Sequence, residues 1–519
     1  MTHTCSIKRS AAIAATCLAL AGCAVGPDFQ QPDVQHADGY APSTLPLATA
    51  SAEGIAGQAQ TFISGRDIPA QWWTVFQSPQ LDHLIRKALQ ANPSIEAAQA
   101  ALRQSQENVY AQQGFFFPTV QAGYAPSRIK LSGNTGGNSP GLQGDGSTIA
   151  TGQTNGSPAA STPVIYNWHS AQLTVGFIPD VFGGNRRQVE SQQAQAEAQR
   201  FQLEAAYITL ASNVVAAAIQ EAALRAQIEA AQRIVEASTQ ALALVRQQFK
   251  FGFAGRLDVA AQESALAQAR QALPPLEKQL EQTRDLIRAL AGNLPSEDVE
   301  EIFILESLQL PEELPVSLPS RLVEQRPDIQ IAKAQLHAAS ADVGVALAAR
   351  LPQLSLNANL GGNASTFNQM FSDSGKFFSV AGNVSQTLFA GGTLLHKQRA
   401  AEQALAKAQA QYRSTVLTAF QNVADTLHAL HTDARNLLAA VEAERAAMTT
   451  LELTRKQREF GQVSKLAVLT AEQAYQQAAI TLVQAQATRL GDTAALFQAL
   501  GGGWWNRKDV LASQMKSER

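Results

Sequence analysis

Residues 185–249 read NRRQVESQQAQAEAQRFQLEAAYITLASNVVAAAIQEAALRAQIEAAQRIVEASTQALALVRQQF. This segment contains no proline, follows Gly183-Gly184, ends just before Gly252, and is dominated by the helix formers alanine, glutamine and leucine. A helix of about 65 residues is roughly 100 Å long, at about 1.5 Å per residue. Since that is several times the width of a globular core, the sequence predicts a helix that no compact domain can enclose.

The same pattern occurs a second time, from Thr393 to Phe460. Similar loops close both copies, FGFAGRLDV at 251–259 and FGQVSKLAV at 460–468. Pro352 follows Pro118 by 234 positions, whereas Gly461 follows Gly252 by 209. A longer loop in the first half accounts for this decrease in the offset between equivalent positions. The chain is therefore predicted to be duplicated. Each half reads helix, strand, strand, long helix, tip loop and returning helix, with Pro274-Pro275 predicted to break the first returning helix.

Four short segments alternate between apolar and polar residues, which indicates β-strands. They lie near 119–131, 171–182, 352–361 and 377–389. Alternation over about 10 residues is typical of a transmembrane β-barrel strand. A soluble sandwich with one hydrated face has a similar pattern but does not account for the long helices. Because the smallest barrels have about eight strands, strands from several copies are expected to share one barrel. Residues 128–164 are expected to form a long external loop.

The N-terminus has the order of a secretory signal. Lys8 and Arg9 precede an apolar run that ends in Leu20-Ala21-Gly22-Cys23. This ending resembles the bacterial lipobox, in which the cysteine becomes the lipidated first residue of the mature protein. An ordinary signal peptide with a chance cysteine is the alternative. On the first interpretation Cys23 carries a covalent lipid. Cys5 and Cys17 are removed with the signal peptide, so the mature protein cannot form an internal disulfide.

These features divide the chain into five predicted parts, of which the two repeats form an α-rich body. They are a lipoprotein signal peptide at 1–22, a lipidated tether at 23–70, a first repeat at 71–310, a second repeat at 311–505 and a C-terminal tail at 506–519. The tether is rich in proline, glycine, alanine and serine, which is expected of a segment that wraps over a surface. The predicted fold class is mainly α, with duplicated long helical hairpins and a small membrane β-barrel.

The sequence contains little that points to covalent chemistry. The formal net charge of −3 gives no reason to expect nucleic acid as a partner. There is no glycine-rich phosphate loop, zinc-protease pair or nucleophile elbow. His428 and His431 could share a metal, although such a pair is usually a hydrated helix face. The chain is therefore expected to be a pore and not an enzyme, with no metal and no cofactor besides the lipid on Cys23.

Several motifs together resemble the TolC-type outer membrane efflux proteins, in their lipoprotein branch of OprM-like and NodT-like members. In order, these motifs are Cys23-Ala24-Val25-Gly26-Pro27-Asp28-Phe29, Trp72-Trp73 with Phe76, Leu273-Pro274-Pro275-Leu276-Glu277, Leu318-Pro319-Ser320-Arg321-Leu322 with Arg326-Pro327-Asp328-Ile329, Leu388-Phe389-Ala390-Gly391-Gly392, and Ala499-Leu500-Gly501-Gly502-Gly503-Trp504. Each is weak alone, and the set covers nearly all of the chain after the signal.

The resemblance implies a homotrimer, lipid-anchored in the outer membrane and extending into the periplasm. Its strands would form one shared 12-stranded β-barrel, and its helices a trimeric α-barrel tunnel. Such proteins export drugs or other toxic small molecules as the outer membrane channel of a tripartite efflux system. They dock at their tips to a periplasmic adaptor protein and work with an inner-membrane RND pump. The alternatives are a duct for type I protein secretion and, in another class, a structural periplasmic coiled-coil lipoprotein.

By position, the resemblance assigns eight residues to the periplasmic tips, where docking and gating occur. They are Gly252, Arg256, Leu257, Asp258, Gly461, Ser464, Lys465 and Leu466. Family members commonly carry carboxylates just after the second tip, but Ala467 and Thr470 stand there in this chain. An ion pair between Asp258 and Lys465, with Arg256 as the competing partner, is then a candidate latch for the tunnel mouth.

Overall fold

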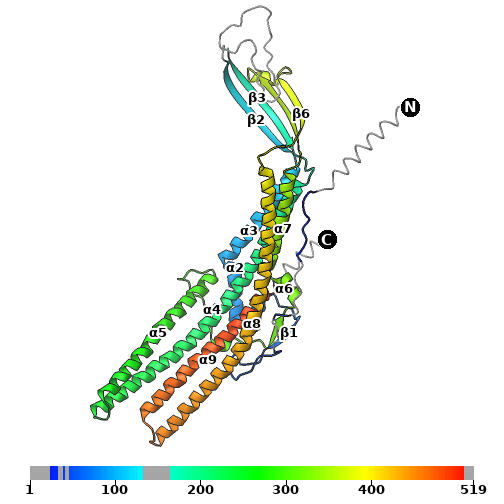
Figure 1. Cartoon of the computed structure of the whole chain (residues 1–519). Coiled ribbons are helices and arrows are strands. Elements are labelled where there is room, and N and C mark those ends of the chain that lie inside the picture. The colour runs from blue at the N-terminus through cyan, green and yellow to red at the C-terminus, as the bar shows by residue number, and fades with distance from the viewer. Residues whose placement is uncertain (1–23, 33–38, 41–45, 132–163, 508–519) are drawn as a thin grey trace, which may run out of the picture. The chain divides into compact units, whose positions relative to one another are not determined.

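The computed structural model describes residues 24–32, 39–40, 46–131 and 164–507. The chain forms two compact units, whose helices and strands are labelled in Figure 1. Unit 1 comprises Met1–Gln30, Ser105–Gln195 and Leu336–Ala408. Unit 2 comprises Gln31–Gln104, Ala196–Gln335 and Gln409–Arg519.

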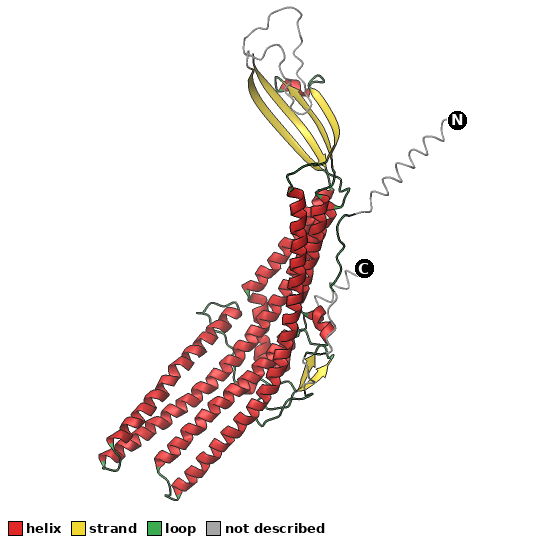
Figure 2. Cartoon of the chain, viewed as in Figure 1, coloured by secondary structure: helices red, strands yellow, loops and turns green. Residues whose placement is uncertain are grey.

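Unit 1 contains an antiparallel sheet of four strands in the order β2-β3-β5-β6. Figure 2 shows the strands side by side as one twisted sheet. The strands are β2 (Thr119–Leu131), β3 (Val164–Phe177), β5 (Gln353–Ala364) and β6 (Lys376–Ser385), with the 3-10 turns η2 (Gly114–Phe116) before β2 and η4 (Asn368–Phe371) between β5 and β6. Pro118 and Pro352 directly precede β2 and β5, where the missing proline N–H removes no hydrogen bond between strands.

The four predicted strands are confirmed, but the bounds predicted for two of them are wrong. The strand predicted at 171–182 begins at Val164 and ends at Phe177, because Pro179 cannot donate a ladder hydrogen bond. The strand predicted to reach residue 389 ends at Ser385. Within the expected external loop at 128–164, residues 128–131 belong to β2, and residues 132–163 lie outside the described part of the chain.

The long helices are confirmed and match in length. Helices α4 (Gly184–Lys250) and α8 (Thr393–Glu459) have 67 residues each, and the returning helices α5 (Arg256–Leu290) and α9 (Lys465–Ala499) have 35 each. In the turns between them, Gly252 has a φ of +78° and Gly461 a φ of +71°, a left-handed conformation that favours glycine. The order helix, strand, strand, long helix, returning helix occurs twice. The repeat boundary at residues 310 and 311 stays a prediction.

Shorter elements complete the chain. They are β1 (Thr61–Ser64), η1 (Trp72–Phe76), α2 (Pro79–Ala91), α3 (Pro93–Gln113), η3 (Leu305–Ser307), β4 (Glu313–Val316), α6 (Pro319–Gln325), α7 (Pro327–Ala348) and η5 (Trp504–Asn506). Strands β1 and β4 pair in parallel. Phe76, Leu84 and Ile85 are fully buried in unit 2, where Trp72 stacks on Phe497 with ring centroids 5.4 Å apart.

The predicted break at Pro274-Pro275 is wrong, because α5 continues through both prolines. Each proline removes one helical hydrogen bond, to the carbonyl four residues earlier. Both side chains are exposed, as are Arg270 and Gln271, whose carbonyls lose those bonds. Water can therefore hydrate the freed carbonyls, and the remaining hydrogen bonds of a 35-residue helix hold its path.

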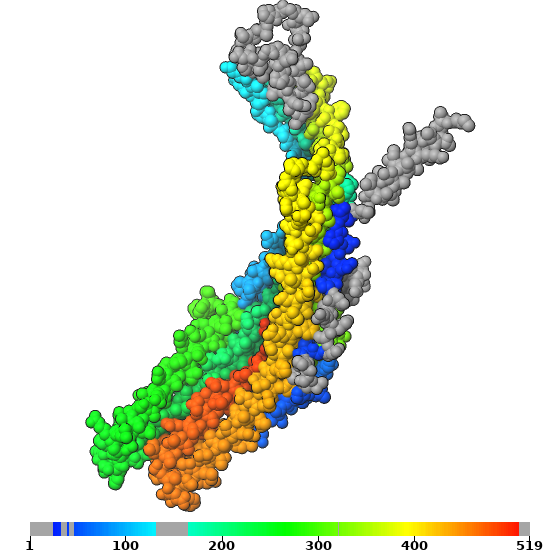
Figure 3. Space-filling model, in the orientation of Figure 1, coloured from blue at the N-terminus to red at the C-terminus, as the bar shows by residue number. Residues whose placement is uncertain are grey.

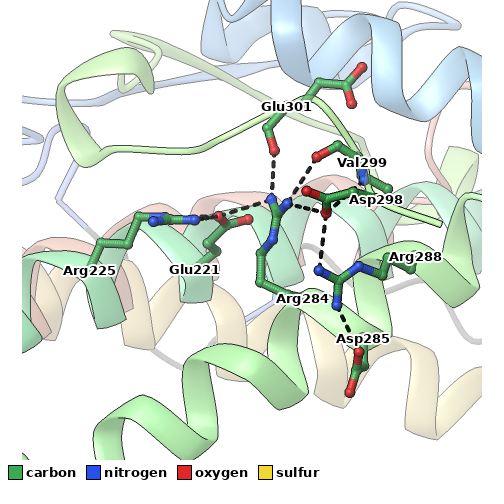
Figure 4. Close-up of polar contacts among 8 residues, drawn as sticks. All are labelled: Glu221, Arg225, Arg284, Asp285, Arg288, Asp298, Val299 and Glu301. Atoms are coloured by element: carbon green, nitrogen blue, oxygen red, sulfur yellow. Dashed lines mark hydrogen bonds and ion pairs between the residues drawn. The ribbon is translucent and has the colours of Figure 1, made fainter. Parts of the chain in front are cut away.

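A buried arginine fixes the loop that follows α5 to the helices of unit 2 (Figure 4). The Arg284 guanidinium donates to the carbonyl oxygens of Glu301 and Val299 at 2.8 and 2.9 Å, and to Asp298 Oδ1 at 2.7 Å. It also lies 3.4 Å from Glu221 of α4, a fully buried carboxylate that pairs with Arg225 at 2.6 Å. One side chain of α5 thus satisfies groups from a loop and from α4.

A second buried arginine holds the described part of the tether against α9. Arg489 Nη2 donates to Thr49 Oγ1 at 2.9 Å and to the Gln58 carbonyl at 2.7 Å. Burial lowers the pKa of Arg489 to about 10, against the effect of the Asp433 charge. Burial and a hydrogen bond with Asp492 raise the pKa of Asp433 to about 7. Asp433 therefore holds a proton in the folded protein at pH values where an unfolded aspartate is ionised.

We expect Asp433 to make the stability of unit 2 depend on pH. An unfolded aspartate has a pKa of about 3.9, so the folded state binds the extra proton between about pH 4 and pH 7. Stability should be highest below that window and fall as pH rises through about 7. Unfolding temperatures in detergent measured from pH 4.5 to 8 should show this slope, and Asp433→Asn should flatten it. Asp425→Asn, an exposed position on the same helix, should leave it unchanged.

Candidate functional site

The sheet of unit 1 has one apolar and one polar face, set by its register. Directly paired residues of antiparallel strands lie on the same face. One row across the four strands contains only apolar residues, Ala122, Leu173, Leu360 and Phe378. The adjacent row contains only uncharged polar residues, Gln121, Thr174, Asn359 and Ser379.

The apolar face is uncovered within unit 1. Val380 is 80% exposed, Phe378 78% and Leu360 61%. A continuous exposed apolar surface of this kind marks contact with a membrane or another protein. The outer strands β2 and β6 each pair on one side only. Since lipid offers no partner to free backbone groups, a sheet that enters a membrane must close these edges by pairing.

The segment behind Cys23 is held by one buried arginine, and we call these contacts the tether clamp. Arg187, near the start of α4, donates from Nη2 to Asp28 Oδ1 at 2.6 Å and from Nε to the Val25 carbonyl at 3.2 Å. Its Nη1 donates to Glu190 at 2.8 Å, and the other oxygen of that carboxylate lies 2.9 Å from His337 Nε2. Cys23 itself lies outside the described residues.

The tether clamp also requires close backbone contact. Gly26 has a φ of +104°, and a Cβ there would lie 2.4 Å from Gly344 Cα of α7. The Phe29 ring stacks on His337 with centroids 4.4 Å apart. These contacts place residues 24–29 against α4 and α7 of unit 1.

We expect Arg187→Met to release this segment. The guanidinium satisfies the Val25 and Gly26 carbonyls and the Asp28 carboxylate, none of which methionine can bond. Hydrogen exchange of residues 24–29 should become much faster in the variant. Arg186→Met is the matched control, because the Asp180 carboxylate that Arg186 contacts keeps two backbone N–H donors. Equal exchange in both variants would contradict the role of Arg187.

The structure places the predicted tip residues at the two helical turns of unit 2, which stand as separate ends in Figure 3. Arg256 and Lys465 begin α5 and α9, and Leu257 is 82% exposed. Ser464 caps α9, its Oγ accepting the Ala467 N–H at 3.2 Å. Leu466 is half-buried against a small cluster of Ala237, Ala241 and Leu469.

The candidate latch is not formed within this chain. Asp258 Oδ2 instead accepts the Gly255 N–H at 2.7 Å and so caps its own helix. No ion pair of Lys465 occurs among the described residues. The first tip thus uses a carboxylate for a capping task that Ser464 performs in the second. A latch between neighbouring copies stays a prediction.

An ion pair that was not predicted from the sequence occurs in both hairpins. Arg246 of α4 lies 2.6 Å from Glu263 of α5, and Arg455 of α8 lies 3.5 Å from Glu472 of α9. The second pair follows the first by the same 209 positions that separate Gly461 from Gly252. Aligning the two halves at that offset would have revealed both pairs.

Two further observations bear on the kind of site. Among the described residues, no group of three or more histidine, cysteine, aspartate or glutamate side chains could hold a metal ion. One described helix, α4, is long and apolar enough to cross a membrane, but 61% of its most apolar window is buried inside the protein. That is weak evidence for a membrane helix, because a core helix passes the same test.

The chain matches the family model described as "Outer membrane efflux protein" over residues 84–293 and 318–502. It is 30% identical over 450 residues to the pyoverdine export outer membrane protein OpmQ of Pseudomonas putida, covering 86% of this chain and 91% of OpmQ. It is 27% identical to the cation efflux system protein CusC of Escherichia coli, covering 94% of this chain and 97% of CusC.

Solved structures agree with these relatives. The outer-membrane channel OprN superposes with a TM-score of 0.76 at 26% identity, over 93% of this chain and all of that chain. The CmeC outer membrane channel of Campylobacter jejuni superposes with a TM-score of 0.80 at 20% identity, over 96% and 98%, and so shares the fold. Because the family model spans both helical halves, the chain belongs to the outer membrane efflux protein family.

Proposed function

We propose that three copies of this chain form the outer-membrane duct of a tripartite efflux system. The observation that carries the proposal is the open sheet of four strands with one exposed apolar face. Pairing β2 of one copy with β6 of the next would close both edges, and three copies would give a 12-stranded barrel. The apolar rows would then face lipid and the uncharged polar rows the lumen.

The helices supply the length that such a duct needs. Each 67-residue helix is about 100 Å long at about 1.5 Å per residue, enough to reach deep into the periplasm. The two tips would dock to a periplasmic adaptor and, with an inner-membrane RND pump, complete the system. The pump would supply the energy, and this chain would perform no covalent chemistry.

The cargo is proposed to be drugs or other toxic small molecules. OpmQ is named for pyoverdine export and CusC for cation efflux, so relatives of this chain serve unlike cargoes. The polar row of the sheet carries no charge, which suits neutral and amphipathic molecules better than selection of one ion. We propose that Cys23 carries the lipid anchor, which mass spectrometry of the N-terminal peptide tests.

Trimer mass and channel conductance test the proposal directly. The purified protein should run as a trimer by native mass spectrometry in mild detergent and form discrete channels in planar bilayers. A deletion strain should become more sensitive to a panel of drugs and dyes. A monomer without conductance would refute the duct. A changed secreted proteome with unchanged drug sensitivity would favour type I secretion. If neither the secreted proteome nor the drug sensitivity changes, a structural lipoprotein is favoured.

We expect the charges at the tips to bias opening of the duct. In the proposed trimer, Asp258 and Lys465 of neighbouring hairpins form the latch, and an exposed ion pair is worth about 0–1 kcal/mol. Three symmetric copies together would change the open population severalfold, since about 1.4 kcal/mol is tenfold.

Single-channel recordings of Asp258→Asn, Lys465→Gln and the double variant check this expectation. Each single change should raise the open probability, and the double variant should add little. Additive effects would show that the two charges are not coupled. Glu263→Gln is the matched control, because it breaks a pair inside one hairpin and leaves the latch intact.

A further inference from the structure

Unit 1 contains a cavity of about 400 Å³ at the end of the sheet where the strands meet the helices. Its lining comes from α3, the loop between β3 and α4, the end of α7 and the start of β5. Most of the lining is apolar, including Phe115, Ile178, Phe182, Val345 and Leu354. The cavity can therefore take a flexible apolar group.

The cavity opens beside the apolar face of the sheet. Leu354 precedes Leu356 and Leu360 by two and six positions along β5, so all three lie on one face. Two lining residues, Phe115 and Ile178, are 65% and 62% exposed. An apolar group that arrives from the proposed membrane would meet these two side chains.

The first described residues of the tether lie beside this cavity. The Val25 N–H donates to the carbonyl of Phe182 at 3.1 Å, and a Cβ on Gly183 would lie 2.5 Å from Ala24 Cα. Phe182 and Gly184, on either side of Gly183, both line the cavity. Cys23 precedes Ala24 by one position, and consecutive Cα atoms are about 3.8 Å apart. The tether clamp thus holds Ala24, the residue next to the proposed point of lipid attachment, beside residues that line the cavity.

One polar atom in the lining lacks a partner. Asn185 Oδ1 accepts from Gln112 at 2.6 Å, but its buried Nδ2 has no hydrogen-bond partner in the described structure. The acyl groups of a lipidated cysteine are joined through ester and amide carbonyls, which accept hydrogen bonds. A carbonyl near the cysteine could satisfy Asn185 Nδ2 while its chain fills the apolar part.

We propose that this cavity holds one acyl chain of the lipid on Cys23. The inference rests on the proposed lipidation and adds where one chain of that lipid goes. Seating one chain here would bind the anchor to its own protein as well as to the bilayer. It would also fix the height of the sheet end relative to the inner surface of the membrane.

Photocrosslinking of the full-length protein in its native membrane tests the inference. A benzophenone amino acid at Leu354 should cross-link mainly to the lipopeptide that begins at Cys23. The same probe at Leu356, which faces the same way but does not line the cavity, should label free phospholipid. Ile178 is a second lining position, and its exposure makes the probe easy to accommodate.

Each outcome is decisive. Labelling of free phospholipid or of a second copy at both Leu354 and Ile178, or no labelling there, would overturn the inference while leaving the anchor intact. Mass spectrometry of the same sample reports on Cys23 separately, and an unmodified cysteine would remove the proposed occupant. Conductance of that sample distinguishes either failure from failure of the duct. Asn185→Leu should weaken cross-linking at Leu354 if its amide binds the lipid carbonyl.

Discussion

Arginine in place of Leu356 is expected to reduce the assembled protein in the outer membrane sharply. Leu356 is 43% exposed and lies in β5 on the apolar face of the sheet. If that face meets lipid, a charge at Leu356 costs up to about 2–4 kcal/mol per copy, which is the cost at the membrane midplane. In the proposed trimer three copies carry the change, so the costs add in the assembled state. Heat-stable trimer, measured by electrophoresis of unheated membranes, should be largely lost.

The neighbouring residue provides the control. Asn357 pairs with Gly176 and Ala381 and points to the opposite face, the proposed lumen. Asn357→Arg should therefore assemble nearly as well as the natural protein, although it should alter ion selectivity in bilayers. Equal loss of trimer in both variants would show that the effect comes from the strand and not from lipid.

Replacing Arg284 by methionine is expected to be the most damaging single change to unit 2. The guanidinium bonds two loop carbonyls and Asp298, and lies beside the fully buried Glu221 (Figure 4). Removing one partner of a buried charge cluster costs about 3–5 kcal/mol, because the remaining groups stay buried and lose their bonds. Arg225 still neutralises Glu221, so we expect the low end, about 3 kcal/mol.

Thermal and guanidinium unfolding in detergent, followed by helical circular dichroism, check this value. Arg233→Met is the matched control, since Arg233 pairs with Glu229 on the same helix α4 at a site where both side chains are more than half exposed. Such a pair contributes about 0–1 kcal/mol. If the two variants unfold alike, the Arg284 contacts do not stabilise the loop in solution.

Local patterns made the helices and strands predictable from sequence. Alanine-rich segments without proline gave α4 and α8 to within a few residues, and alternation located β2 and β5. The sequence predicts only the second half of the strand at 164–177, because Tyr166 lies between apolar Ile165 and polar Asn167 and strict alternation is lost there. The break predicted at Pro274 and Pro275 is wrong because helix propensity does not show whether a carbonyl that loses its hydrogen bond can reach water.

The site residues depended on contacts between distant segments. Arg187 and Asp28 are 159 positions apart, and neither stands in a periodic pattern that points to the other. The raised pKa of Asp433 arises from burial and from Asp492 on another helix, which a sequence does not display. The Arg246–Glu263 pair is the one contact that could have been predicted, because aligning the two halves places Arg455 and Glu472 at the same positions.

The equal lengths of the paired helices restrict how this chain can change size. In both hairpins a 67-residue helix is followed by one of 35, so the two turns come at matching distances along their helices. Seven residues inserted in α4 alone would move that turn by about 10 Å. Keeping the tips level would then require insertions in three other helices at once. Single insertions and deletions should therefore survive mainly in the loops, and a longer duct should arise only by coordinated change in all four helices.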